Sequence, residues 1–265
     1  MRKGTDSMIR LGVLGAGGRM GRAIIAEAAA AADVEVIGAV ERQGHEALGG
    51  DVGGIRITDD IGPVAQKADV LIDFSTPASL DEHLRAALDH NAAMVIGTTG
   101  LDSRQHTAID KASRSIPILQ SANMSLGVNL MAGLVELAAR ALGPDWDIEI
   151  LEWHHRHKVD APSGTALALG EAAARGRGAL LKDLRLPPYD GIGEPRRQGG
   201  IGFATVRAGS VAGRHEAIFA TEGERLVIVH EAENRAIFAR GALAAARWLA
   251  GRPADRYTMR DVLDL

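Results

Sequence analysis

Residues 11–22, LGVLGAGGRMGR, carry the strongest structural signal in this sequence. They place a glycine cluster directly after an apolar, strand-like run and at the start of a helical pattern over residues 20–32. Gly15 permits a tight turn, while Gly17 and Gly18 let the backbone approach a pyrophosphate closely. The helix that follows supplies free N–H groups and a favourable dipole at its N-terminus. We therefore predict a strand–turn–helix unit that binds a dinucleotide.

An acidic residue further along supports this prediction, because a glycine pattern alone is weak evidence. Strict spacing would put the third glycine at position 20, where this chain has Met20, with Gly21 one place later. Glu41 ends the next strand-like run, about 20 residues past the turn, where an acid bonds the ribose hydroxyls. Arg42 and Arg19 are suited to a 2′-phosphate, so the acid and the bases together predict use of NADH or NADPH. The alternative is that Glu41 and Arg42 are merely solvated residues after a strand.

Strand-like and helical runs alternate through the first half of the chain. Runs that are apolar on consecutive residues favour strands buried on both faces of a parallel sheet. The alternation predicts an α/β fold whose N-terminal part is a Rossmann-type doubly wound parallel sheet. The further strand candidates are VEVIGAV, ADVLIDFS, AAMVIGTTG and IPILQSAN, and the helical segments are residues 78–89 and 102–113.

Two of these strands end in polar residues, DFSTP at 73–77 and GTTG at 97–100. Ligands of an open parallel sheet bind beyond the carboxyl ends of the strands, so both segments should line the nicotinamide side of the site. The alternative is that their Ser, Thr and Pro residues cap the helices that follow. Both interpretations can hold for the same residues.

The pattern changes after about residue 125. We predict a second, α+β domain over residues 126–234 with a mixed four-stranded sheet, while residues 1–125 and 235–265 form the dinucleotide-binding domain. The last two strands of the second domain are separated by a tight turn with glycine, which favours a hairpin. The predicted elements are the helix SLGVNLMAGLVELAARAL, the strand DIEILEWHH, a helix from about Ser163, a loop over 184–200, and the strands IGFATVRAGS, HEAIFATEG and ERLVIVHEAE.

Composition limits the classes of function. The net charge of −4 argues against non-specific nucleic-acid binding, and no run is long and apolar enough to predict a membrane partner. The chain has no Cys, which excludes disulfides and thiolate nucleophiles. With no apolar signal core after the first residues, we expect a cytoplasmic enzyme. Met8 is an alternative start, and residues 1–7 are left out of the fold prediction.

The most informative segment for chemistry is EWHHRHKVDAPSGTA, residues 152–166. It carries three histidines within four positions, followed by Lys158. A His with a pKa near neutrality is a good general acid, and cationic side chains bind carboxylates. The turn that starts a helix at Ser163 adds free N–H groups. The segment therefore predicts a site that holds a dianionic substrate and supplies a proton.

Other interpretations of the segment are weaker. A metal site built from His154, His155 and His157 has neither a Cys nor a ligand at helical spacing, so we expect no metal. A cluster that binds a phosphate or an acidic partner is a second alternative. An ordinary exposed basic loop is a third, disfavoured because the segment follows a buried-looking strand directly.

The segment closely resembles the signature of the 4-hydroxy-tetrahydrodipicolinate reductase (dihydrodipicolinate reductase) family of the diaminopimelate route to lysine. GAGGRMGR, DFSTP, GTTG, SANMSLGVN, GFATVRAGSVAGRH and GERLVIVHEAENRAIFARGAL resemble the same family in the same order. The resemblance covers nearly the whole chain from Ile9. It implies reduction of a cyclic imine dicarboxylate by NADH or NADPH, and a homotetramer assembled through the sheet of the second domain.

The resemblance also implies roles for individual residues. His154 would be the proton donor and Lys158 a second donor or charge stabiliser. The residues implied in binding the substrate are His155, Gly164, Thr165 and Arg235. Those implied in binding the cofactor are Gly15, Ala16, Gly17, Gly18, Arg19, Met20, Glu41, Arg42, Gly97, Thr98, Thr99, Ser121, Ala122, Asn123 and Met124. The chain departs from the family at Met124, where Phe is usual, and at Trp153, where a smaller residue is common and packing behind the histidines is expected to change.

Two rival functions keep the cofactor site. Another amino-acid-pathway dehydrogenase, such as an aspartate or homoserine dehydrogenase, would not need three histidines in four residues. A non-catalytic NAD(P) sensor would have no reason to keep His154 and Lys158 together. A kinase or ATPase is excluded, since no glycine loop ends in Gly-Lys-Ser/Thr.

Overall fold

The computed structural model describes residues 8–265 and divides into two compact units. Unit 1 extends to Leu126 and includes Ala236–Asp264, and unit 2 is Gly127–Arg235 together with Leu265. Each unit has its own sheet and its own hydrophobic core. The alternative start at Met8 concerns residues 1–7, which lie outside the described part of the chain.

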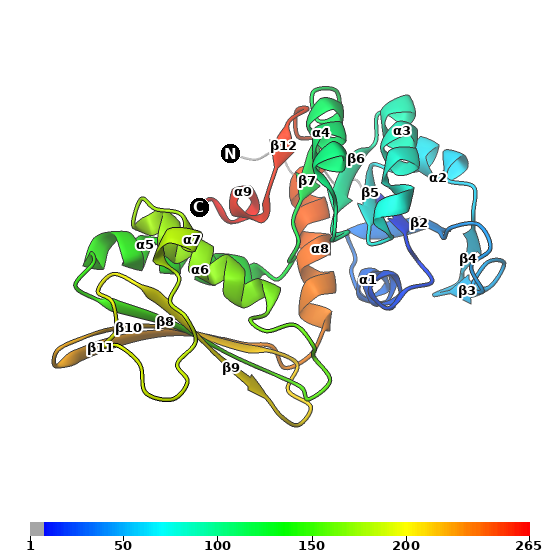
Figure 1. Ribbon diagram of the computed structural model, residues 1–265. Helices are drawn as coiled ribbons and strands as arrows, with labels where there is room; N and C mark the ends of the chain where they lie inside the picture. The colour runs from blue at the N-terminus through cyan, green and yellow to red at the C-terminus, as the bar shows by residue number, and fades with distance from the viewer. Residues whose placement is uncertain (1–7) are drawn as a thin grey trace. The chain divides into compact units, whose positions relative to one another are not determined.

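Unit 1 is built on an eight-stranded sheet with the order β12-β7-β6-β5-β1-β2-β4-β3 (Figure 1). All neighbouring strands pair in parallel except β3 and β4. Strand β1 lies in the middle of the sheet and later strands add outward in both directions, so the predicted doubly wound fold is confirmed. The strands are β1 (Ile9–Leu14), β2 (Val34–Val40), β3 (Asp51–Val52), β4 (Ile55–Thr58), β5 (Val70–Asp73), β6 (Ala93–Ile96), β7 (Ile118–Gln120) and β12 (Arg256–Tyr257).

Helices cover both faces of this sheet, which is why its strands are apolar on consecutive residues. Val13 and Ile72 belong to one core, with helices α1 (Arg19–Ala29) and α8 (Ala236–Leu249). Their chain neighbours Leu14 and Leu71 belong to the core on the opposite face. That second core is formed with α2 (Gly62–Lys67), α3 (Leu80–His90) and α4 (Ser103–Ala112). The remaining elements are the 3₁₀ turn η1 (Pro77–Ser79) and α9 (Met259–Leu263).

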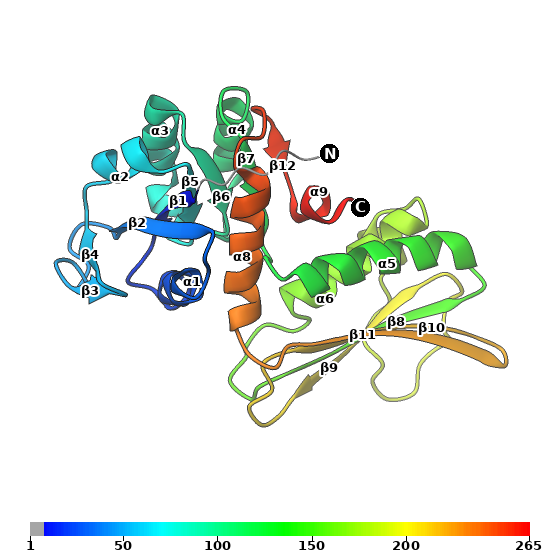
Figure 2. The same ribbon diagram turned by 180° about the vertical axis from the view of Figure 1, so that it is seen from behind.

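Unit 2 contains a four-stranded sheet with the order β11-β10-β8-β9. Strands β8 and β9 pair in parallel and the other neighbours pair antiparallel, so the predicted mixed sheet and the predicted β10–β11 hairpin are confirmed. Figures 1 and 2 both show the helices of this unit on one face of the sheet. The elements are α5 (Leu126–Leu142), β8 (Asp147–His154), α6 (Gly164–Gly176), α7 (Leu181–Leu184), β9 (Ile201–Arg207), β10 (Arg214–Thr221) and β11 (Glu224–Glu231).

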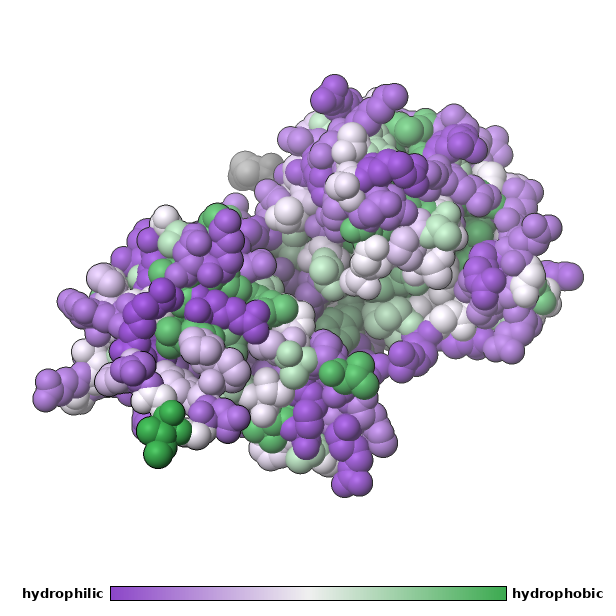
Figure 3. Space-filling model, viewed as in Figure 1, coloured by the Kyte–Doolittle hydropathy of each residue, from purple (hydrophilic) through white to green (hydrophobic). Residues whose placement is uncertain are grey.

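Burial alternates along the two central strands of this sheet, β8 and β10, as expected for a sheet with one covered face. Along β8, the side chains of Ile148, Ile150, Glu152 and His154 are buried, and those between them are not. The surface visible in Figure 3 is mainly hydrophilic on each unit, with separate hydrophobic patches. Within residues 8–265 no helix has the length and apolar character needed to span a bilayer.

Candidate functional site

The glycine turn after β1 has the backbone that the sequence pattern requires. Gly15 lies at φ +78°, and a Cβ there would be 2.6 Å from the carbonyl oxygen of Phe74. A Cβ on Gly21 would be 2.3 Å from the carbonyl oxygen of Gly15. Gly21 therefore lets helix α1 pack closely against the glycine turn, as the third glycine of the pattern does. It stands one position later than the strict spacing requires.

The start of α1 is suited to an anion. Its N-cap residue, Gly18, has no side chain, and within the described residues no side-chain cap bonds the first turn, which also has no acidic residue. The first backbone N–H groups of a helix have no acceptor within the helix. The turn and this helix end therefore fit a pyrophosphate group.

Glu41 lies against the glycine turn. Its side chain is buried at 8% exposure, and one carboxylate oxygen accepts a hydrogen bond from the Gly17 N–H at 3.1 Å. The other oxygen accepts from the Arg42 N–H at 3.0 Å. Arg42 and Arg19 are exposed. The structure thus places a carboxylate at the turn and keeps both guanidinium groups accessible, which fits a ribose diol with or without a 2′-phosphate.

A fully buried carboxylate, Asp73, organises the end of β5. One oxygen lies 2.8 Å from His83 Nδ1, and the other accepts hydrogen bonds from the Ser75 hydroxyl at 2.6 Å and the Thr98 hydroxyl at 3.0 Å. Burial alone would raise the pKa of Asp73, but the contacts with His83 and Ser75 outweigh it and hold the pKa below its usual value. Asp73 therefore links β5 to the loop after β6.

The other predicted cofactor residues follow neighbouring parallel strands at the same sheet edge. Gly97 follows β6, and a Cβ there would be 2.3 Å from the Phe74 ring. Ser121 follows β7, and its N–H donates to the carbonyl of Ile96 at 3.1 Å. Met124 is buried in the core of unit 1, so at this position Met fills apolar space.

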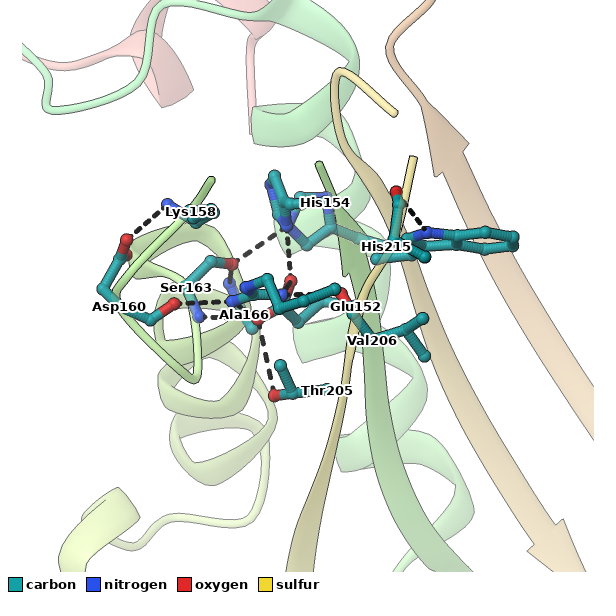
Figure 4. A network of polar contacts seen from close by, with 12 residues as sticks. Glu152, His154, Lys158, Asp160, Ser163, Ala166, Thr205, Val206 and His215 are labelled. Atoms are coloured by element: carbon teal, nitrogen blue, oxygen red, sulfur yellow. Dashed lines mark hydrogen bonds and ion pairs between the residues drawn. The ribbon is translucent and has the colours of Figure 1, made fainter. Parts of the chain in front are cut away.

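The second group of predicted residues lies in unit 2, around the end of β8. His154 is the last residue of β8, and its side chain is 11% exposed. Its Nδ1 is hydrogen-bonded to the carboxylate of Glu152, which is fully buried (Figure 4). A Cβ on Gly213 would be 3.0 Å from His154 Nε2, so glycine leaves room beside that atom.

Burial and charge set the protonation of these groups. Burial alone would raise the pKa of Glu152, but hydrogen bonds from Arg207, His154 and Ser163 hold it below its usual value. Burial lowers the pKa of His154, and the contact with Glu152 opposes this only in part. His215, whose ring lies 5.1 Å from that of His154, has a pKa lowered to about 4, chiefly by burial.

The loop after β8 carries the remaining cationic residues. Lys158 Nζ pairs with the Asp160 carboxylate at 2.7 Å, and the Lys158 N–H donates to the carbonyl of His155 at 3.1 Å. His155 and Arg156 line an open depression together with His157. In the described part of the chain, no group of three or more His, Asp or Glu side chains is arranged to hold a metal ion.

Helix α6 starts where the sequence predicts. Ser163 is its N-cap, and the Ser163 hydroxyl accepts a hydrogen bond from the Ala166 N–H at 3.2 Å. Gly164 and Thr165 form the first turn and Gly164 is exposed. Arg235 is the last residue of the main segment of unit 2 and is exposed.

Four residues of this network were not predicted from the sequence: Glu152, Ser163, Arg207 and His215. Glu152 had a local signal, since residues two apart on a strand share a face and Glu152 therefore lies beside His154. Ser163 was predicted only as the start of a helix. Arg207 and His215 come from other strands, and their position depends on strand register, which no local pattern gives.

Comparison with known proteins identifies the family. Residues 9–124 match the family model described as Dihydrodipicolinate reductase, N-terminus, and residues 127–263 match the one described as Dihydrodipicolinate reductase, C-terminus. A 4-hydroxy-tetrahydrodipicolinate reductase of Zymomonas mobilis is 51% identical over 260 residues, which cover 98% of this chain and 99% of the relative. One from Acinetobacter baumannii is 45% identical over 264 residues, covering 97% of this chain and 96% of the relative.

A solved structure agrees at the level of the fold. The dipicolinate-bound dihydrodipicolinate reductase of Paenisporosarcina sp. TG-14 superposes with a TM-score of 0.76 at 24% identity, covering 95% of this chain and 97% of that chain. Both halves of the chain, and nearly all of its length, are thus matched by the family that the sequence motifs resemble. The chain belongs to the dihydrodipicolinate reductase family.

Proposed function

We propose that the chain reduces 4-hydroxy-tetrahydrodipicolinate, by way of dihydrodipicolinate, to tetrahydrodipicolinate with NADH or NADPH, in the diaminopimelate route to lysine. Relatives that are 51% identical over nearly the whole chain carry the name of this reductase. The observation in the structure that carries the proposal is the buried His154–Glu152 pair beside the N-terminus of α6. When bound, the reduced nicotinamide supplies the hydride.

The cofactor is assigned to unit 1. The glycine turn and the start of α1 hold the pyrophosphate, Glu41 holds the ribose, and Arg42 is available to a 2′-phosphate. The close approach of Gly15 to Phe74 and the uncapped start of α1 support this assignment. The segments after β6 and β7 contact the nicotinamide: Gly97, Thr98, Thr99, Ser121, Ala122, Asn123 and Met124.

The substrate is assigned to unit 2. A dicarboxylate needs cations and hydrogen-bond donors, and unit 2 offers a helix N-terminus at α6 and cationic side chains in the loop before it. The solved relative from Paenisporosarcina is named as binding dipicolinate, which is itself a dicarboxylate. The carboxylate-binding residues are His155, Gly164, Thr165 and Arg235.

His154 supplies the proton. An ionised carboxylate only accepts hydrogen bonds, so the bond to Glu152 requires that Nδ1 of His154 carry a proton. The atom left to transfer a proton is Nε2, beside which Gly213 leaves space. Lys158 stabilises charge close to the ring or serves as a second donor.

In this proposal the two units have different binding functions. Residues 1–125 and 235–265 bind the dinucleotide, and residues 126–234 bind the substrate and mediate assembly.

A homotetramer would form through the sheet face of unit 2 that carries no helix. Large apolar residues are exposed on that face, and they are Trp153, Val206, Val227 and Val229. Sedimentation should give a tetramer that V229E disrupts, and a wild-type monomer would contradict the assignment.

We also place the enzyme in the cytoplasm, where reduced nicotinamide cofactors are regenerated. Fractionation of cells that express the full chain tests this placement. Recovery with a cytoplasmic marker enzyme is expected, and recovery with an extracytoplasmic marker would contradict it.

Turnover with defined substrate tests the function. Substrate is generated in the assay from pyruvate and aspartate semialdehyde, and loss of reduced cofactor is followed by absorbance. We expect turnover in the wild type and a loss of about 100-fold or more in H154A, since general acids typically contribute that much. H90A, which removes an exposed His on α3, serves as the control. Cofactor binding without turnover in the wild type would favour a sensor or another dehydrogenase.

A further inference from the structure

A buried carboxylate joins two strands and a helix in unit 2. Glu152 is fully buried, and both of its oxygens accept hydrogen bonds. Arg207 donates to both, with Nη1 at 2.8 Å and Nη2 at 2.7 Å, in a two-pronged arrangement. The Ser163 N–H donates at 3.0 Å, and His154 donates from Nδ1. A buried ion pair is rarely a net source of stability, so stability alone does not explain a buried carboxylate with this many donors.

The bond to Glu152 determines the orientation and the tautomer of His154. With Nδ1 committed to a carboxylate, the proton on the ring that can be exchanged is the one on Nε2. The same carboxylate accepts from the N-cap residue of α6, so it connects the ring to the helix start assigned to the substrate carboxylate. Figure 4 shows Glu152 in the same network of polar contacts as His154 and Ser163. We infer that Glu152 fixes the position of the proton donor relative to the assigned carboxylate site.

Arg207 sets the charge around the ring. It occupies the position opposite His154 in the β8–β9 register, and its guanidinium also donates to the carbonyl of Asp160 at 2.5 Å. The Arg207 cation neutralises the Glu152 anion, so the imidazole faces a paired rather than a free carboxylate. Without that pairing, Glu152 would bind the protonated ring strongly and hinder release of the proton.

The other charged and titratable groups around the ring leave this balance in place. Lys158 disfavours the charged ring, and Lys158 is itself paired with Asp160. His215 packs edge-on against His154 and is uncharged near neutrality. The carboxylate that contacts the ring is that of Glu152.

We propose that Glu152 and Arg207 are positioning residues with opposed effects on His154: Glu152 orients the ring and favours its protonated form, and Arg207 limits that preference so that the proton is released to the substrate. The proposal rests on the proposed role of His154 as the proton donor. A purely structural ion pair is the competing explanation: its charges would also shift the titration of the ring, but the folded variants would keep the wild-type plateau value of kcat.

The first test replaces the carboxylate by an amide of the same shape. In E152Q, the pH at which kcat declines should move to lower pH by about one unit, because the ring loses a charge that favours its protonated form. We expect kcat to fall by about 100-fold at neutral pH, since the ring also loses its fixed tautomer. NMR titration of the His154 ring, assigned with H154A, should show the same shift without any turnover.

The second test removes the opposing charge. In R207M, the decline of kcat and the NMR titration of His154 should both move to higher pH by about one unit. If R207M fails to fold, R207K keeps the charge without the two-pronged geometry and should give a smaller shift in the same direction. Opposite shifts of the kcat profile, combined with a lower plateau value of kcat in folded E152Q, are the result that a structural role would not produce.

A matched control and a double variant complete the test. E136Q removes a carboxylate paired with Arg175 at 3.3 Å in the same unit and should move neither titration. In an H154A background, E152Q should cost little further activity if Glu152 acts through the ring. The proposal would be overturned if neither E152Q nor R207M moved the titration of His154. It would also be overturned if E152Q lowered kcat as much in the H154A background as in the wild type. Full activity in H154A alone would instead refute the role of His154.

Discussion

His215 makes a quantitative prediction for the pH dependence of stability. The side chain is 4% exposed, its Nε2 lies 3.2 Å from the Ser163 hydroxyl, and its Nδ1 has no hydrogen-bond partner among the described residues. Burial, with a smaller contribution from the charge of His154, lowers its pKa from 6.5 to about 4. The folded protein therefore keeps this ring neutral at a pH where the unfolded chain protonates it.

The direction and size of the effect follow from proton linkage. Between pH 6.5 and 4 the unfolded state binds the extra proton, so stability falls as the pH is lowered through this window. The stabilising contribution is complete above the unfolded pKa and is lost below the folded one. A tenfold difference in proton affinity between the folded and unfolded states corresponds to about 1.4 kcal/mol, so the whole window corresponds to about 3 kcal/mol.

H215Q tests this contribution, because Gln keeps a polar group near the Ser163 hydroxyl but does not titrate. Urea unfolding is measured at a fixed protein concentration from neutral pH to about pH 4. The free energy of unfolding of the wild type should fall by about 3 kcal/mol more than that of H215Q across the window. Carboxylates such as Asp73 are present in both proteins and cancel in the difference. Parallel curves would refute the assignment of a neutral buried ring.

Three further substitutions test the architecture of unit 1. D73N removes the charge that holds Thr98, and it should weaken NAD(P)H binding by about 10-fold or more in fluorescence titration while destabilising the protein by about 3 kcal/mol; unchanged affinity would contradict this. G241A places a Cβ 1.7 Å from the carbonyl oxygen of Met124. The free energy of unfolding should therefore fall by about 1–3 kcal/mol or more, seen as a lower melting temperature. G15A, at φ +78°, should lose cofactor binding as well as stability, and an unaltered dissociation constant would count against the turn's assigned role.

The fold class was predictable because strand burial leaves a clear pattern in the sequence. Apolar residues on consecutive positions indicated helices on both faces, and the two cores of unit 1 follow that rule. The elements that were missed are short: β3 and β12 have two residues each, α2 has six, and β4, α7 and α9 have four or five. Such segments are too short to show a period of their own, and β12 is defined by its pairing with the distant strand β7.

In unit 2, the candidate site was predictable only where its residues are close in sequence. The segment from Glu152 to Ala166 carries the ring, the lysine and the helix start in one run. Arg207 lies beside that run only because β9 pairs with β8, and His215 only because β10 does. Strand register is a property of tertiary packing, so these partners had no signal near the motif.

The alternation of β8 explains how one strand serves two functions in our proposal. Glu152 and His154 point to the covered face, whereas Trp153 between them is 40% exposed on the opposite face. From the sequence we expected Trp153, where the family has a smaller residue, to change packing behind the histidines. Because Trp153 lies on the opposite face, it instead changes the surface that we assign to assembly. A shift of one residue in the register of β8 would exchange these faces, exposing the buried carboxylate and burying the indole. The bidentate bond from Arg207 and the bond from the Ser163 N–H both disfavour that shift, so the contacts that hold the ring also maintain the face that we propose for assembly.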